Sequence, residues 1–264
     1  MLFNDFEYDG IKLSEMGYMI CTFGNKGLET VSSGSQLKFN TIGTRNGEKH
    51  EVTSVEYDGC VEATFAICKN LCSGKTFEIT KDEYRHLTGW LNRKQLHTLK
   101  IVDGDFENVY LNASFNIGRI EMNGKLYGLE LKMTTDKPYG VRQAYQQTLS
   151  FTSGHLTQVF HNESEVEGII YPKAVITVGS TGNLDILNAL ENRHTYIASC
   201  TQSEVITMEY PIIQTSLAAH KIQNDFNWNF FRLASTFTKK DNYITTSIPC
   251  TIKLTYNPVV NLIM

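Results

Sequence analysis

Hydrophobic positions recur at helical spacing in one well-bounded stretch of the chain, which begins just after Thr80. The repeat places four apolar residues on one face of an α-helix: Tyr84, Leu87, Trp90 and Leu91. The Thr80 hydroxyl can accept from a free N–H of the first turn, and Glu83 can reach back to the N–H of Thr80, which completes a capping box. Arg93 would lie near the other end, where positive charge suits the helix dipole. The pattern predicts a helix over about residues 81–93.

After this helix the apolar period changes to two residues, which is the spacing of β-strands. Two successive stretches alternate in this way: Val109, Leu111, Ala113 and Phe115 in the first, and Tyr127, Leu129, Leu131 and Met133 in the second. Between them, Asn123-Gly124 is the dipeptide most suited to a type I′ hairpin turn. Pro138 cannot donate to a strand ladder, so it ends the paired stretch. The pattern predicts a long hairpin followed by a break in the chain.

Strand-like runs also lie on both sides of this central stretch. In the first half they are 3–8, 60–68 and 77–79, with turns or polar loops at 9–10, 32–35 and 43–49. In the second half they are 174–178, 184–187, 196–197, 205–208, 244–248 and 251–256, and 151–160 is a loop or short helix. Short, closely spaced strands with turns between them favour a sandwich. The sequence predicts a mainly β chain with one helix in its first half.

Composition is that of a globular protein, with 264 residues, 41% apolar residues and 20% charged residues. The formal net charge of −4 argues against a protein that binds nucleic acid by neutralising phosphates. The first residues lack the basic and apolar regions of a signal peptide, and no apolar run approaches the roughly 20 residues that span a bilayer. We therefore expect a chain made in the cytoplasm, with no membrane segment.

The six cysteines are expected to remain reduced in that compartment. Cys68 and Cys72 form the one close pair, but a zinc site needs about four ligands and no second pair stands at a matching spacing. His86 is the nearest histidine downstream. Buried or loop thiols are therefore favoured over a metal site, and we predict no metal and no cofactor.

Other candidate chemistry is equally weak. The glycines of Gly179-Ser-Thr-Gly182 lack the following Lys-Ser/Thr of a phosphate loop, so a turn is the better interpretation. Ser153 and His155 are neighbours in sequence, which does not make a catalytic triad. Three carboxylates on one strand face can bind a cation, but a solvated edge explains them better: Glu163, Glu165 and Glu167. No catalytic residues are predicted.

An aromatic cluster near the C-terminus permits two interpretations. Phe226, Trp228 and Phe230 alternate as they would on one strand face, which favours burial in the core of the second half. Exposed aromatic rings can instead stack on sugar rings, as they do in β-sandwich carbohydrate modules. Trp228 is the candidate carbohydrate contact under that second interpretation.

Several segments together resemble the phage distal tail proteins, the hub components of siphophage tails. The opening from Phe6 to Tyr18 has an aromatic residue, Asp-Gly-Ile and then a Gly-aromatic pair, as members of that family do. A helix that ends in Trp90-Leu91, a β-rich stretch and a Pro138-Tyr139 junction follow in the family's order. The closing strands are similar too, with Asn242-Tyr-Ile followed by 251–256. The resemblance covers most of the chain, and the order of the segments carries it.

The resemblance implies two domains, a β-rich belt domain over 1–138 and a galectin-like β-sandwich over 139–264. It implies that six copies close into a ring at the virion tail tip, encoded by a phage or prophage and made in the bacterial host cytoplasm. That ring would join the tail tube to the tail-associated lysin, fibre or baseplate proteins. DNA would pass through its channel without specific binding. The cysteines and residues 151–166 have no counterpart in the family pattern.

Three hypotheses follow from these observations. The leading one is a structural tail-hub protein without enzymatic activity. The alternative is a carbohydrate-binding sandwich for attachment to the host surface, with Trp228 in contact with the sugar. An enzyme of unidentified type ranks last, because no nucleophile, base or ligand set is apparent in the sequence.

Overall fold

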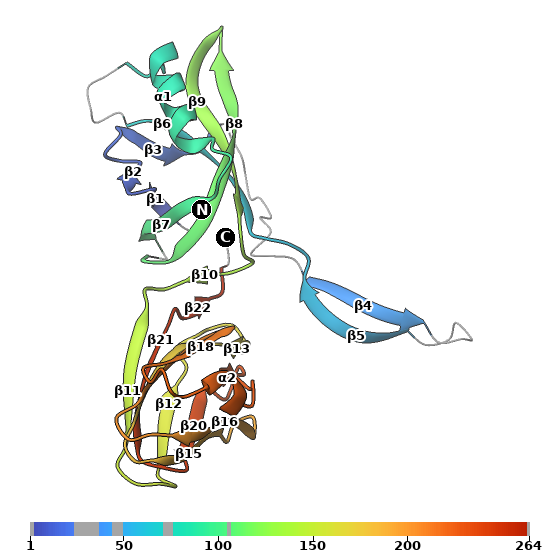
Figure 1. Ribbon diagram of the computed structural model, residues 1–264. Helices are drawn as coiled ribbons and strands as arrows, with labels where there is room; N and C mark the ends of the chain where they lie inside the picture. Colours follow the sequence, from blue (N-terminus) through green and yellow to red (C-terminus); the bar gives the residue numbers. More distant parts are fainter. Residues whose placement is uncertain (1–2, 24–36, 44–49, 71–75, 105–106, 263–264) are drawn as a thin grey trace. The chain divides into compact units, whose positions relative to one another are not determined.

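The chain forms two compact units in a computed structural model that describes residues 3–23, 37–43, 50–70, 76–104 and 107–262 (Figure 1). One unit comprises residues 1–142 and 260–264, and the other comprises 143–259. The predicted second domain runs from residue 139 to the C-terminus, whereas Val260 and Leu262 are buried in the core of the first unit. The polar loop predicted at 32–35, the one predicted at 43–49 apart from Gly43, and Cys72 lie outside the described residues.

The first unit is built on a nine-stranded sheet. Its main path runs β2 (Ile11–Lys12), β1 (Phe3–Tyr8), β7 (His97–Gly104), β8 (Tyr110–Met122), β9 (Lys125–Thr135), β6 (Glu62–Lys69) and β3 (Tyr18–Cys21). The short β10 (Gly140–Val141) pairs with β8, and β22 (Val259–Val260) pairs with β10. Neighbouring strands on the main path are antiparallel, so simple turns connect several of them.

Alternation along β8 and β9 produces the core of this unit, as the sequence predicted. The inward residues of the two strands are buried, and they include Leu111, Phe115, Leu129, Leu131 and Met133. Phe6 of β1 adds a ring whose centroid lies 5.9 Å from that of Phe115. The turn between β8 and β9 has positive φ at both central residues, 51° at Asn123 and 74° at Gly124, which confirms the predicted type I′ geometry.

The single long helix among the described residues, α1 (Lys81–Leu91), packs its apolar face onto this core. The predicted capping box is present, because Thr80 Oγ1 accepts from the Glu83 N–H and Glu83 Oε2 accepts from the Thr80 N–H. Trp90 is a core anchor whose indole N–H donates to the Tyr8 carbonyl at 3.1 Å.

The helix ends two residues earlier than predicted, and Arg93 explains the end. Its Nε–H donates to the Trp90 carbonyl at 2.8 Å, which satisfies one of the free acceptors of the last turn. Its Nη1–H donates to Asp9 Oδ2 at 2.6 Å. This hydrogen bond from Arg93 holds the pKa of the Asp9 carboxyl below its ordinary value. Arg93 therefore stabilises the helix end from outside the helix.

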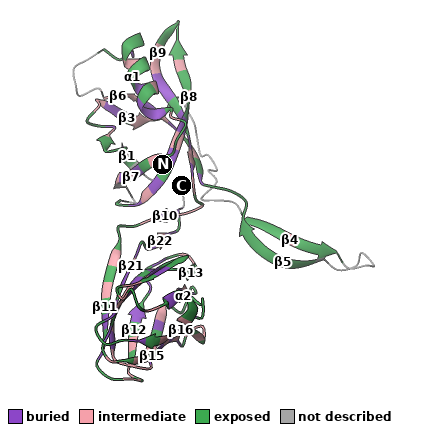
Figure 2. Cartoon of the chain, viewed as in Figure 1, coloured by how far each residue is buried: buried purple, intermediate pink, exposed green. Residues whose placement is uncertain are grey.

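A second, separate sheet in the first unit consists of two strands only, β4 (Leu37–Gly43) and β5 (His50–Tyr57). The two strands are antiparallel over their whole length. None of the described residues in this hairpin belongs to either buried core. Figure 2 shows the hairpin as exposed along both strands.

The second unit is a β-sandwich. One sheet has the order β11 (Tyr145–Phe151), β21 (Cys250–Tyr256), β14 (Lys173–Val178), β17 (Val205–Glu209) and β18 (Ile212–Thr215). The other has the order β12 (Thr157–His161), β20 (Asp241–Thr246), β15 (Gly182–Asn188) and β16 (Arg193–Cys200). A short pair, β13 (Gly168–Ile170) with β19 (Leu233–Ser235), and the one-turn helix α2 (Ile222–Asp225) complete the unit.

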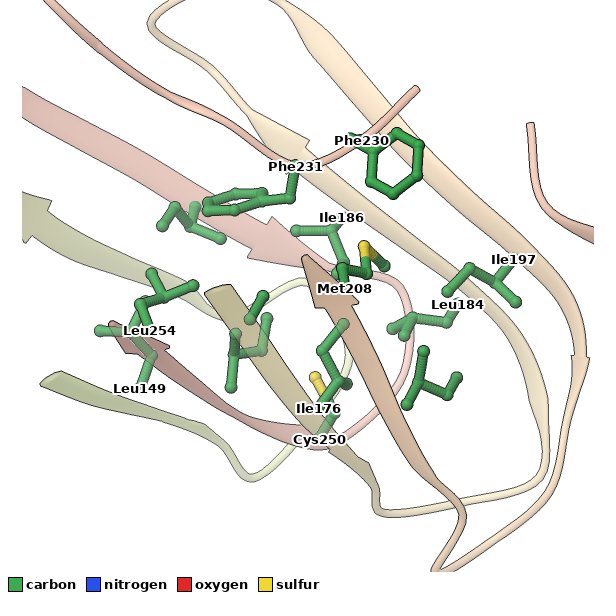
Figure 3. Close-up of a cluster of buried hydrophobic side chains, with 14 of the residues drawn as sticks. Leu149, Ile176, Leu184, Ile186, Ile197, Met208, Phe230, Phe231, Cys250 and Leu254 are labelled. Atoms are coloured by element: carbon green, nitrogen blue, oxygen red, sulfur yellow. The ribbon is translucent and has the colours of Figure 1, made fainter. Parts of the chain in front are cut away.

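Both sheets contribute to one core. Ile176 and Leu254 come from the first sheet and Leu184 and Ile186 from the second, and all four belong to a single buried cluster (Figure 3). Buried and more exposed residues alternate along β14, β15, β20 and β21, as expected when one face of each sheet is covered. The predicted mainly β class, with a helix in the first half and a sandwich in the second, is confirmed.

Two local predictions were wrong. Residues 77–79 are irregular instead of forming a strand: Ile79 is buried and its N–H donates to Leu126, whereas Phe77 is exposed. The stretch 151–160 is neither one loop nor a helix, because it joins the end of β11 to β12 through a turn. In both places backbone hydrogen bonds to distant segments determine the conformation. No helix in the described part of the chain is long and apolar enough to cross a membrane.

Candidate functional surface

The register of the β4–β5 hairpin divides its side chains cleanly between two faces. Leu37 is opposite Tyr57, Phe39 is opposite Val55, and Thr41 is opposite Val52. Directly opposed residues share a face, and successive residues along a strand alternate between faces. One side, which we call the apolar face, therefore carries Leu37, Phe39, Thr41, Val52, Val55 and Tyr57.

The opposite side is mostly polar. It carries Lys38, Asn40, Ile42, Glu51, Ser54 and Glu56. The Asn40 amide donates to Ser54 Oγ at 3.0 Å and also to Glu56 Oε1, so these three side chains satisfy one another. The Thr53 hydroxyl donates to the Asn40 carbonyl at 3.0 Å where the register shifts by one residue. This bulge keeps Val52 and Val55 on the same side.

The apolar face is exposed to solvent in the single chain. Phe39 is 59% exposed and Val55 is 51% exposed. No other described element of the chain covers this face, although a two-stranded hairpin alone is at best marginally stable in water. An apolar surface of this kind on a folded protein marks a site of protein–protein contact. The hairpin is therefore the candidate functional surface of the first unit.

The apolar face of the β4–β5 hairpin was not predicted from the sequence. The signal was present in 50–57, where Val52, Val55 and Tyr57 recur, but the extra residue at Thr53 interrupts their alternation. A strict period of two does not detect a strand with a bulge.

The predicted carbohydrate contact, Trp228, lies in the second unit and is 56% exposed. The stretch that follows α2 is irregular, so the predicted strand face is wrong. Phe226, Phe230 and Phe231 are buried, as the core interpretation expected, but Trp228 is not. The indole packs against Phe226, with ring centroids 5.7 Å apart.

The remaining candidates do not come together as sites. The three carboxylates predicted on one strand face are exposed in an irregular segment: Glu163, Glu165 and Glu167. Gly179 and Gly182 lie at the turn between β14 and β15. Ser153 and His155 lie in the turn that follows β11, with no hydrogen bond between their side chains among the described residues. Among all the residues that the structure describes, no group of three or more His, Cys, Asp or Glu side chains is placed to hold a metal ion.

The five described cysteines are free thiols. The pKa of Cys21 is raised to about 12, mainly by burial and to a lesser extent by a hydrogen bond with Cys68. Burial likewise raises the pKa values of Cys200 and Cys250 to about 11. Near neutral pH these three thiols stay protonated, so they are unsuited to act as nucleophiles.

Two family models match the chain along nearly its whole length. Residues 1–137 match a model described as "Phage tail protein N-terminal domain", and residues 139–256 match one described as "Phage tail C-terminal domain". The chain belongs to this family of phage tail proteins. No curated protein sequence matches it.

A solved structure extends the similarity to the fold of a tail hub. The Dit protein of phage SPP1, described as "a Paradigm of Hub Adsorption Apparatus in Gram-positive Infecting Phages", matches with a TM-score of 0.62. The match covers 96% of this chain and 98% of the Dit chain, at 12% sequence identity. At that identity the match shows the fold alone. Together with the family models, it confirms the resemblance to phage distal tail proteins that the sequence indicated.

Proposed function

We propose that this phage tail protein is a structural component of the tail tip, assembled as a ring of six copies. The ring would join the tail tube to the tail-associated lysin, fibre or baseplate proteins, without enzymatic activity of its own. The tail-protein family and the fold of a hub protein support this role. The exposed apolar face of the β4–β5 hairpin carries the proposal, because none of the described residues covers it and a partner molecule would.

A second copy of the chain is the partner that accounts best for this face. A hairpin that docks onto a different surface of its neighbour makes a heterologous contact, and repeated heterologous contacts close into a ring or extend into a filament. A ring has a fixed mass at all concentrations above its assembly threshold, whereas a filament grows. The apolar face would be buried at each contact. Covering the hairpin in this way would also protect its exposed strand edges.

The mild negative charge of −4 agrees with a channel that lets DNA pass without holding it. Specific nucleic-acid binding is not part of the proposal. The protein would be made in the bacterial host cytoplasm, from a phage or prophage gene, and function in the virion.

The mass of the purified protein by light scattering after size exclusion tests the proposal. We expect six times the chain mass of 29.9 kDa, unchanged over a wide range of concentration. Val55→Asp places a charge on the apolar face and is expected to give a monomer. Ile42→Asp is the matched control, because Ile42 lies on the opposite face of the same hairpin and is 61% exposed.

Two results would contradict the role of this face. In one, Val55→Asp assembles like the unmodified chain. In the other, Val55→Asp and Ile42→Asp lose assembly equally, which would mean that the hairpin simply tolerates no added charge. A chain that remains monomeric even when mixed with its tail-tube partner would contradict the ring itself.

A further inference from the structure

Two cysteines share one face of the nine-stranded sheet, on the neighbouring strands β3 and β6. Met19 of β3 is opposite Cys68 of β6, and Cys21 is opposite Ala66. Because every second residue of a strand lies on the same face, Cys21 and Cys68 are diagonal neighbours on that face. Ile67, which is next to Cys68 in the chain, is buried in the core. The two thiols therefore lie on the side of the sheet that faces away from the core.

The two thiols are also in contact with each other. A hydrogen bond joins the Cys21 thiol to Cys68 and contributes to the raised pKa of Cys21, as expected when Cys21 donates the proton. Both residues are free cysteines, and both are only partly buried. The pair is thus preformed in the reduced protein and open to a small oxidant.

The chain that follows Cys21 packs over the strand next to Cys68. Gly128 of β9 is directly opposite Cys68, on the side of β6 away from β3. A Cβ atom at position 128 would lie 2.4 Å from Cζ of Phe23, so glycine makes room there for the aromatic ring. The ring of Phe23 therefore reaches past β6 to β9. This packing holds the end of β3 on the sheet and keeps Cys21 beside Cys68.

The position of β3 allows the small movement that a bond between the sulfurs requires. Diagonal neighbours in a sheet have Cα atoms about 7–8 Å apart, whereas a disulfide needs about 4.4–6.8 Å. Strand β3 ends the main path of the sheet, and among the described residues it pairs with β6 alone. A strand that is paired on one side only can shift toward its neighbour without breaking a second ladder.

We infer that Cys21 and Cys68 are a disulfide-forming site, which closes when the protein leaves a reducing cytoplasm and meets a peroxide. Disulfides persist in oxidising surroundings and are rare in the cytoplasm, where the protein is made. The bond would close residues 21–68 into one loop, and that loop contains the whole β4–β5 hairpin. The site does not depend on ring assembly.

The chemistry requires one peroxide molecule for each disulfide. The Cys21 thiol keeps its proton because its pKa is about 12, so Cys68 reacts first. Its thiolate sulfur attacks one peroxide oxygen and the O–O bond breaks, which gives a sulfenic acid at Cys68 and one water. The Cys21 sulfur then attacks the Cys68 sulfur and the S–O bond breaks. The Cys21 proton leaves with the hydroxyl group as a second water.

Peptide mass spectrometry tests the inference after the full chain is treated with hydrogen peroxide, unfolded and alkylated. We expect a peptide pair linked through Cys21 and Cys68, which dithiothreitol separates. In Cys21→Ser the reaction should stop at the sulfenic acid of Cys68, which dimedone traps. Cys60→Ser is the matched control, because Cys60 is an exposed free cysteine of the same unit, and this variant should keep the link.

Thermal unfolding gives a second measurement. A cross-link between distant residues restricts the unfolded chain, so oxidation should raise the melting temperature of the unmodified chain by roughly 5–10 °C and leave that of Cys21→Ser unchanged. The reduced forms of both proteins are compared first, to verify that Cys21→Ser folds.

Two outcomes would overturn the inference. In one, the thiols of the unmodified chain are oxidised and no link between Cys21 and Cys68 forms. In the other, the main product joins Cys68 to Cys72 or joins two chains. The Val55→Asp variant should form the same link as the unmodified chain, which separates a failure of this site from a failure of the proposed ring.

Discussion

Two hairpins of the first unit both alternate apolar and polar residues, but the apolar face of one is buried and that of the other is exposed. In β8–β9 the apolar side chains form the centre of a core, covered by α1 and by the aromatic residues of neighbouring strands. In β4–β5 a mostly apolar face is exposed, and the hairpin pairs with no other strand of the part of the chain that the structure describes. The difference shows that alternation specifies which side of a strand is apolar but not which molecule covers it.

Turn chemistry and neighbours explain why the first hairpin is complete within the chain. Asn123 and Gly124 adopt positive φ readily, which sets the register of β8 against β9. Strands β6 and β7 then pair with the two outer edges of this hairpin. The β4–β5 hairpin has no such flanking strand among the described residues. Its apolar face therefore has the composition of an interior and the exposure of a surface, as expected of a contact made between chains.

The largest expected effect distinguishes the two hairpins directly. Phe115→Ala removes a fully buried ring from β8 and should lower the free energy of unfolding by about 3–5 kcal/mol. Phe39→Ala removes the same ring from the apolar face of β4 and should change it by no more than about 0.5 kcal/mol. Urea unfolding of both variants in the monomeric Val55→Asp background makes the measurement without a contribution from assembly.

An equal loss of stability in the two variants would mean that the chain itself covers the β4–β5 hairpin. In the assembled protein, by contrast, Phe39→Ala is expected to have a clear effect. There Phe39→Ala should raise the concentration needed for assembly, because it removes buried area at every contact.

The sequence predicted the covered parts of the fold better than the exposed parts. The Thr80 capping box, the Asn123-Gly124 turn and the inward residues of β8 and β9 follow from local chemistry, and all are present. The return of Val260 to the first unit was not predicted, since it depends on where the second unit directs the chain.

The candidate sites show the same limit. Trp228 is exposed because Asn227 bonds to β16, a contact between residues distant in the sequence. Cys21 and Cys68 are likewise separated in the sequence and are brought together only by the pairing of β3 with β6. No spacing rule detects such a pair, and the bulge at Thr53 conceals the β4–β5 alternation in the same way.

A smaller effect is expected where the capping box begins α1. Thr80→Ala removes the acceptor for the Glu83 N–H and should lower the free energy of unfolding by about 1 kcal/mol. Thr53→Ala, on the exposed β4–β5 hairpin, removes a hydroxyl that also bonds to backbone, yet it should leave the unfolding of the core unchanged. Urea unfolding of the two variants compares them. A similar loss for both would indicate that the hairpin unfolds together with the core.

The smallest effect concerns pH. The hydrogen bond from Arg93 lowers the pKa of Asp9 in the folded state, so this pair stabilises the fold fully above the ordinary aspartate pKa of about 3.9. The stabilisation is lost as the pH falls through the lowered folded-state pKa. Asp9→Asn should therefore be less stable than the unmodified chain at neutral pH, and the difference should shrink in acid. Glu56→Gln changes a residue of the hairpin, which lies outside both cores. This variant should lose thermal stability in acid to the same extent as the unmodified chain. Thermal unfolding between neutral pH and strong acid measures both variants, and an Asp9→Asn curve parallel to that of the unmodified chain would show that this contact does not help to hold the covered region together.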